Sequence, residues 1–215
     1  MIARDGLPVI LGTGIILLVL LILAFIFRYL ALWIIIVPVA ILFVFNFFFF
    51  RDPERSFEGP ANVIVAPADG KVILIEEADE PYFLKTKARK ISIFMSVFNC
   101  HVNRIPITGT VDFLQYKKGQ FLAAFDHRTG ELNEQQIIGL TTPYGKILFK
   151  QIAGLIARRI VCKLNLGQKV QRSQRFGMIK YGSRLDIFLP LDVDIKVKLN
   201  QKTTAGETII GVFNQ

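Results

Sequence analysis

The sequence predicts a mainly β domain, shaped as a barrel or sandwich, behind an N-terminal transmembrane helical hairpin. Residues 1–50 are almost free of charge, whereas residues 51–215 hold nearly all of the charged side chains. In this second part, short apolar runs are separated by Gly, Pro, Asp and Asn, which is typical of antiparallel sheets. Helical periodicity is nearly absent there, and the polar residues 121–136 predict a loop or a short helix at best.

Two apolar stretches make up the first 50 residues. Residues 6–27 carry no charge, and residues 29–50 are apolar apart from Asn46, with Arg28 between the two stretches. Each stretch of 22 residues would form a helix of ~33 Å, which is enough to cross a hydrocarbon core of ~30 Å. We therefore expect a membrane anchor over residues 1–50, with helices at about 6–27 and 29–50.

The charges that flank the anchor predict its orientation. Two crossings leave both ends on one side, and the arginines at these ends, Arg4, Arg51 and Arg55, favour the cytoplasm. We therefore expect the protein at the cell (inner) membrane with its β domain in the cytoplasm. The turn at Arg28 and Tyr29 lacks Gly and Pro, so a shallow hairpin that does not fully cross stays open as an alternative.

Residues 51–215 are long enough for one domain with its own core, and no linker divides them. They carry 24 basic and 16 acidic side chains, a net charge of +8, which suits a surface of anionic phospholipid. The alternative is a solvated face rich in lysine. The basic residues are scattered without interleaved aromatics, so nucleic acid is not an expected partner. Cys100 and Cys162 form no motif and are expected to be reduced thiols in the core, and no metal site is expected.

Short β-forming runs predict the strands of this domain. The expected strands are Asn62–Ala66, Lys71–Glu76, Lys90–Phe98, Thr108–Tyr116, Lys146–Ala153, Leu155–Cys162, Ile179–Leu189, Asp194–Leu199 and Glu207–Phe213.

The string FGMIKYGSRLDIFLP at residues 176–190 contains the most informative dipeptide, Gly182-Ser183. It lies inside or between strand-like runs. Glycine leaves its own carbonyl open to approach, and the hydroxyl of the next residue could attack it. The plain alternative is a turn or a bulge without chemistry.

Two further turns carry polar side chains. APADG at residues 66–70 has Pro and Gly placed for a tight turn and presents the carboxylate of Asp69. NCHVNRIP at residues 99–106 follows the most apolar strand and carries His101, one of two histidines in the chain. The alternatives are that Asp69 only stabilises its turn and that His101 is a buried core residue whose hydrogen bonds are all made within the protein.

Together these pieces resemble the phosphatidylserine decarboxylase family in its short form. The matching segments are APADG at 66–70, NCHVNRIPITG at 99–109 and RFGMIKYGSRLDIFLP at 175–190. The resemblance implies a self-processing proenzyme in which Ser183 attacks the Gly182 carbonyl to form an ester. Elimination to dehydroalanine and hydrolysis then leave a pyruvoyl group.

The resemblance also implies the products and the cofactor. The cut separates a large chain, 1–182, from a small chain, 183–215, which remain associated, and the pyruvoyl made from Ser183 is the covalent cofactor. The substrate is phosphatidylserine in an anionic phospholipid membrane, and the products are phosphatidylethanolamine and CO2. Loss of CO2 leaves an α-carbanion that needs an electron sink, and a Schiff base between the pyruvoyl and the substrate amine provides one.

Within this reaction, His101 is the expected acid or base, because its ordinary pKa lies near neutrality. Asp69 is the expected partner that holds its tautomer. Longer members of the family carry two histidines three residues apart, and the second position is Arg104 here, so either His101 serves both steps or another group replaces the missing base. His127 matches no motif and is expected at the surface.

A non-enzymatic alternative is a membrane-anchored adaptor of the lipoyl or biotinyl type. The segments APADGKV and GQKVQRSQRFG look like halves of such a barrel, and lipoyl-type halves are expected in either case. Adaptors of this kind insert a long helical hairpin with heptads between the halves, and residues 109–153 show no such repeat. We therefore favour the pyruvoyl-dependent carboxy-lyase. The headgroup chemistry does not distinguish acyl phosphatidylserine from an archaeal ether lipid.

Overall fold

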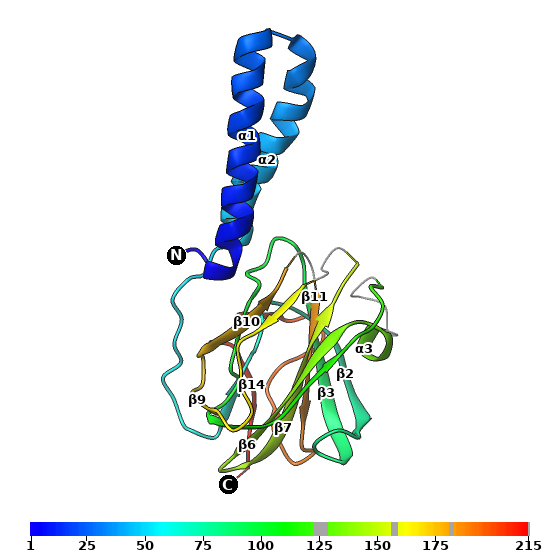
Figure 1. Ribbon diagram of the computed structural model, residues 1–215. Helices are drawn as coiled ribbons and strands as arrows, with labels where there is room; N and C mark the ends of the chain where they lie inside the picture. The colour runs from blue at the N-terminus through cyan, green and yellow to red at the C-terminus, as the bar shows by residue number, and fades with distance from the viewer. Residues whose placement is uncertain (123–128, 156–158, 181–182, 215) are drawn as a thin grey trace. The chain divides into compact units, whose positions relative to one another are not determined.

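The computed structural model describes residues 1–122, 129–155, 159–180 and 183–214 of the chain (Figure 1). It contains two compact units, Met1–Glu54 and Arg55–Gln215, which are described separately below.

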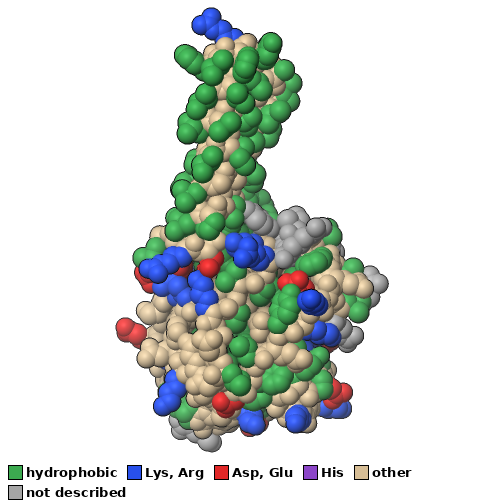
Figure 2. Space-filling view, in the orientation of Figure 1, with side chains coloured by type: hydrophobic (Ala, Val, Ile, Leu, Met, Phe, Trp, Pro, Cys, Tyr) green, Lys and Arg blue, Asp and Glu red, His purple; other side chains and the backbone are tan. Residues whose placement is uncertain are grey.

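The first unit is a helical hairpin. A short 3-10 helix, η1 (Arg4–Gly6), leads into α1 (Leu7–Phe27), and a second, η2 (Leu30–Leu32), leads into α2 (Trp33–Phe49). Together with these turns, both helices (Arg4–Phe27 and Leu30–Phe49) are long and apolar enough to cross a membrane, and Figure 2 shows apolar side chains over their surface. The predicted fold class, an apolar N-terminal hairpin with a mainly β domain, is confirmed.

Small and polar residues hold the two helices together. Asn46 of α2 is fully buried, and its Nδ2 donates a hydrogen bond of 3.2 Å to Thr13 Oγ1 of α1. A Cβ on Gly14 would lie 3.0 Å from the Phe43 ring, so glycine permits this close approach. Such contacts are the usual means of helix association in lipid, where apolar burial gives no driving force.

The second unit is built from antiparallel sheets. An eight-stranded sheet that curls on itself (Figure 1) has the order β13-β2-β3-β11-β7-β6-β5-β9. Two three-stranded sheets have the orders β4-β10-β8 and β1-β14-β12. The strands are β1 (Val63–Val65), β2 (Gly70–Glu80), β3 (Thr86–Met95), β4 (Val102–Arg104), β5 (Gly109–Lys117), β6 (Gln135–Thr142), β7 (Gly145–Ala153), β8 (Ile160–Cys162), β9 (Lys169–Val170), β10 (Arg175–Ile179), β11 (Ser183–Leu189), β12 (Asp194–Ile195), β13 (Lys202–Thr203) and β14 (Ile209–Val212).

Apolar side chains cover both faces of the large sheet. The main core includes Ile93 of β3, Leu185 of β11 and Phe176 of β10. A smaller cluster on the opposite face contains Leu148 and Phe188. Central strands are therefore buried on both sides, and every residue of β11 is buried.

Several expectations about the strands were wrong. The strand expected over Asp194–Leu199 covers only Asp194–Ile195 in β12, and β4 and β10 were not expected. No strand was expected over Gln135–Thr142, yet β6 pairs with β5 and β7 there, because tertiary pairing organises a segment whose own pattern is weak. The single strand expected over Ile179–Leu189 is instead two strands. Strand β10 ends at Ile179 in a three-stranded sheet, and β11 begins at Ser183 in the large one. The short helix allowed within residues 121–136 is present as α3 (Thr129–Leu132).

Candidate functional site

Ser183 is the first residue of β11, a central strand of the large sheet. Its register partners are Met95 at the end of β3 and Ala153 at the end of β7. The side chain is fully buried, and Oγ lies 3.3 Å from the Met95 sulfur. A thioether is a weak acceptor, so this contact leaves the hydroxyl able to turn toward another group.

An ion pair on the other face of β11 fixes the position of Ser183. Residues alternate along a strand, so Arg184 and Asp186 face away from Ser183. Arg184 Nε donates to Asp186 Oδ1 at 2.6 Å, and its Nη2 donates to Asp186 Oδ2 at 3.0 Å and to Ser92 Oγ at 2.9 Å. A slip of one residue would turn both charges into the apolar core, so the pair enforces the register.

His101 lies between the tight turn that follows β3 and the start of β4. The Asn99 side chain accepts hydrogen bonds from the amide and hydroxyl of Ser96, which shapes the turn. The ring of His101 is fully buried, with Nδ1 3.0 Å from the Asn99 carbonyl oxygen. A carbonyl oxygen only accepts, so Nδ1 carries the proton in the neutral ring and Nε2 carries the basic lone pair.

The Met95 sulfur joins the His101 segment to Ser183. It accepts from Ser183 Oγ and lies 3.8 Å from Nδ2 of Asn103, the second residue after His101. Asn103 Oδ1 in turn accepts from Gln151 Nε2 of β7 at 2.8 Å. The sequence did not point to Met95, Asn103 or Gln151 as site residues. Two sequence signals could have found two of them: Asn103 lies in the NCHVNRIP segment with His101, and Gln151 is a lone amide in an apolar run.

The Asp69 carboxylate is held by Arg55. Arg55 Nη2 donates to Asp69 Oδ2 at 3.0 Å, Arg55 Nη1 donates to Oδ1, and the Ala205 amide donates to Oδ1 at 2.7 Å. Burial lowers the pKa of Arg55, but the hydrogen bond and charge of Asp69 outweigh it, so the pKa is raised overall. Cys100, the residue before His101, also acts electrostatically on Arg55. The Arg104 amide donates to the Pro67 carbonyl at 3.0 Å, so the Asp69 turn lies near the segment that carries His101. That Asp69 supports His101 stays a prediction.

Arg104 occupies the position of the second histidine. It is almost fully buried, and its Nη1 donates to the Ser173 carbonyl at 2.8 Å and to the Arg55 carbonyl at 3.3 Å. A guanidinium stays protonated in proteins, so Arg104 supports the backbone here and does not replace a titrating base.

Two predicted residues, Gly182 and His127, lie outside the described residues. Cys100 is buried and Cys162 partly buried, and neither forms a disulfide. Burial raises the pKa of Cys162. Among the residues that the structure describes, no three His, Cys, Asp or Glu side chains are grouped as a metal would require.

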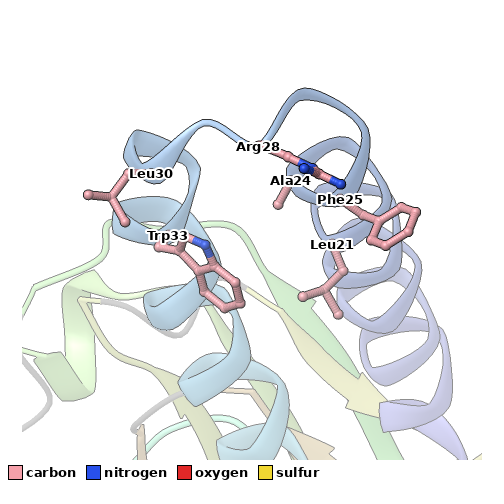
Figure 3. Close-up of a pocket in the computed structure, with 6 residues that line it drawn as sticks. All are labelled: Leu21, Ala24, Phe25, Arg28, Leu30 and Trp33. Atoms are coloured by element: carbon pink, nitrogen blue, oxygen red, sulfur yellow. The ribbon is translucent and has the colours of Figure 1, made fainter.

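A crevice of about 470 Å³ lies at the tip of the hairpin, where α1 and the start of α2 diverge (Figure 3). It is open and mostly apolar, with Arg28 as its charged side chain, and it belongs to the first unit. The groups around Ser183 belong to the second unit. The residues that line the crevice are Leu21, Ala24, Phe25, Arg28, Leu30 and Trp33.

Comparisons with known proteins assign a family. The model of the phosphatidylserine decarboxylase family matches residues 42–211, a range that contains Ser183, His101 and Asp69. The chain is similar to proteins named phosphatidylserine decarboxylase proenzyme from three bacteria. It is 52% identical to that of Prosthecochloris aestuarii over 161 residues (75% of this chain and 74% of the relative) and 52% identical to that of Chlorobaculum tepidum over 162 residues (75% and 74%). It is 46% identical to that of Magnetococcus marinus over 163 residues (75% of each).

Proposed function

Because the chain belongs to the phosphatidylserine decarboxylase family, we propose that it converts phosphatidylserine to phosphatidylethanolamine and CO2. The family resemblance found in the sequence is thereby confirmed. The observation that carries the proposal is the place of Ser183. It is a fully buried hydroxyl at the start of a central strand, and its thioether neighbour also contacts the strand that follows His101.

The first reaction is maturation, and the relatives' name, proenzyme, supports it. Ser183 Oγ attacks the carbonyl carbon of Gly182, and the peptide C–N bond breaks as the acyl group passes to oxygen. His101 takes the hydroxyl proton and delivers it to the released nitrogen. Loss of the Ser183 α-proton then expels the Gly182 carboxylate. Water hydrolyses the resulting enamine and ammonia leaves, so that residue 183 becomes a pyruvoyl group.

The surroundings of Ser183 fit such a group. The side chain is enclosed and donates to the neutral Met95 thioether, while the charged Arg184–Asp186 pair lies on the other face. When formed, the pyruvoyl group supplies a keto carbon that condenses with the substrate amine and takes up the electrons left by CO2. His101 is proposed to return a proton to the substrate α-carbon from Nε2, since Nδ1 faces the Asn99 carbonyl.

The anchor places this chemistry at a membrane. Its two helices are long and apolar enough to span the bilayer, and the arginines at their ends favour a cytoplasmic β domain. Residues 51–215 carry a net charge of +8, which attracts them to anionic lipid such as the substrate.

The adaptor alternative is not favoured. Family membership points to the decarboxylase, and the segment between the lipoyl-like halves contains the strands β5, β6 and β7 of the large sheet. The helical hairpin of an adaptor is not found among the described residues of that segment.

Intact mass of the purified protein tests the proposal. The wild type should give two unequal chains. The smaller should begin at residue 183, and its mass should be lower by one NH3 than that of the same chain with an N-terminal serine. Ser183→Ala should give one chain of 24.3 kDa. A wild type that stays intact after long incubation would contradict the pyruvoyl assignment.

A further inference from the structure

Gln151 of β7 is fully buried, and only the nitrogen of its side-chain amide forms hydrogen bonds. Its Nε2 donates to Asn103 Oδ1 at 2.8 Å and to the Val161 carbonyl at 3.3 Å. Because a carbonyl oxygen only accepts, Val161 fixes which end of the amide is the nitrogen. Gln151 Oε1 then has no hydrogen-bond partner among the described residues.

A buried acceptor without a donor is rare and unfavourable in proteins. The backbone of β10 packs closely against the Nε2 end of this side chain. A Cβ on Gly177 of β10 would lie 2.0 Å from the Val161 carbonyl oxygen and 3.2 Å from Gln151 Nε2. The nitrogen end of the amide is therefore paired, and its oxygen is a buried acceptor that a donating ligand would satisfy.

The unused oxygen belongs to the face of the sheet that carries Ser183. Gln151 is the register partner of Leu185, and Leu185 lies two residues after Ser183 on the same face of β11. Asn103, which holds Gln151, also contacts the Met95 sulfur to which Ser183 Oγ donates.

We propose that Gln151 Oε1 accepts a hydrogen bond from the amino group of the substrate headgroup as it reaches residue 183, an inference that rests on the proposed function. The carboxylate and phosphate of a phosphoserine headgroup only accept, and its amine is the group that donates. The acceptor also has the right charge for the chemistry, because the amine must lose a proton before it can attack a carbonyl. A carboxylate here would stabilise the ammonium form, whereas a neutral amide does so far less.

The test uses the full-length protein and two substitutions. Gln151→Met keeps an unbranched side chain and removes the acceptor, and Gln151→Glu keeps the shape and adds a negative charge. The matched control is Gln135→Met. Gln135 has the same buried, unpaired Oε1, but it is the register partner of Ile152 and so lies on the opposite face of the sheet.

Binding is measured for short-chain phosphatidylethanolamine, which has the amine, and for short-chain phosphatidylglycerol, which lacks it. Loss of one neutral hydrogen bond should weaken binding of phosphatidylethanolamine to Gln151→Met about tenfold and leave phosphatidylglycerol unchanged. The pH profile of decarboxylation by Gln151→Glu should move to higher pH, because its carboxylate holds the amine protonated. Gln135→Met should match the wild type in both measurements.

Equal weakening for both lipids, or none for either, would overturn the proposal, as would an unshifted profile for Gln151→Glu. The glutamate variant tests the same point if the methionine variant does not fold. Intact mass is recorded for each protein to separate two negative outcomes. A wild type that does not cleave contradicts the proposed function, whereas a cleaved enzyme whose lipid binding does not depend on Gln151 contradicts only the present proposal.

Discussion

Asp186→Asn should destabilise the β domain strongly, because it leaves the Arg184 guanidinium buried without its carboxylate. Arg184 and Asp186 are each about 1% exposed and share two hydrogen bonds. Removing one partner of such a pair costs about 3–5 kcal/mol, against a total stability of roughly 5–15 kcal/mol for a domain. Lys150, the register partner of Asp186 and also nearly buried, would lose a favourable charge as well.

The assay is urea unfolding of the full chain in detergent, in a Ser183→Ala background so that a single chain unfolds. Asp194→Asn is the matched control, since Asp194 pairs with Lys196 and both side chains are about half exposed. An exposed pair is worth at most about 1 kcal/mol. If Asp186→Asn lost no more stability than Asp194→Asn, the buried pair would not be what holds β11. A double change of Arg184 and Asp186 to leucine should cost less than the single one, because it removes the buried guanidinium together with its carboxylate.

Three further outcomes are expected. His101→Ala should abolish decarboxylation, self-cleavage or both, whereas His127→Ala should keep nearly full activity. Product analysis measures decarboxylation and intact mass measures cleavage; full activity of His101→Ala with loss in His127→Ala would show that the wrong histidine is named. Deleting residues 1–50 should leave self-cleavage intact and slow the reaction on phosphatidylserine vesicles more than on a short-chain analogue, and equal vesicle rates would show that the anchor serves only for location. Burial lowers the pKa of Lys150 below 10.5, so the unfolded chain binds more protons just below that pH and stability rises with pH there. Lys150→Met should flatten this rise in unfolding experiments at alkaline pH, and an unchanged slope would contradict the assignment.

Local chemistry was readable from the sequence. The hydroxyl of Ser183 after a glycine, and the place of His101 after an apolar strand, depend on neighbours along the chain. The contacts that surround Ser183 depend instead on strand pairing. Asn103 and Gln151 meet because β4 and β7 lie close together, and no local pattern encodes that.

The boundary between β10 and β11 shows the same limit. The run from Ile179 to Leu189 reads as one strand, because both halves are apolar and β-forming. The chain nevertheless leaves one sheet at Ile179 and enters another at Ser183, and the change of sheet follows from how the two sheets pack.

The central place of β11 between β3 and β7 (Figure 1) has a consequence for biogenesis. The cut proposed before Ser183 would divide the polypeptide but not the fold, since the small chain supplies β11 to the large sheet and β14 to the middle of a small one. The nucleophile reaches its place only once β11 is inserted between its neighbours. Maturation would then act as a checkpoint on folding, so that a misfolded precursor never acquires its reactive carbonyl.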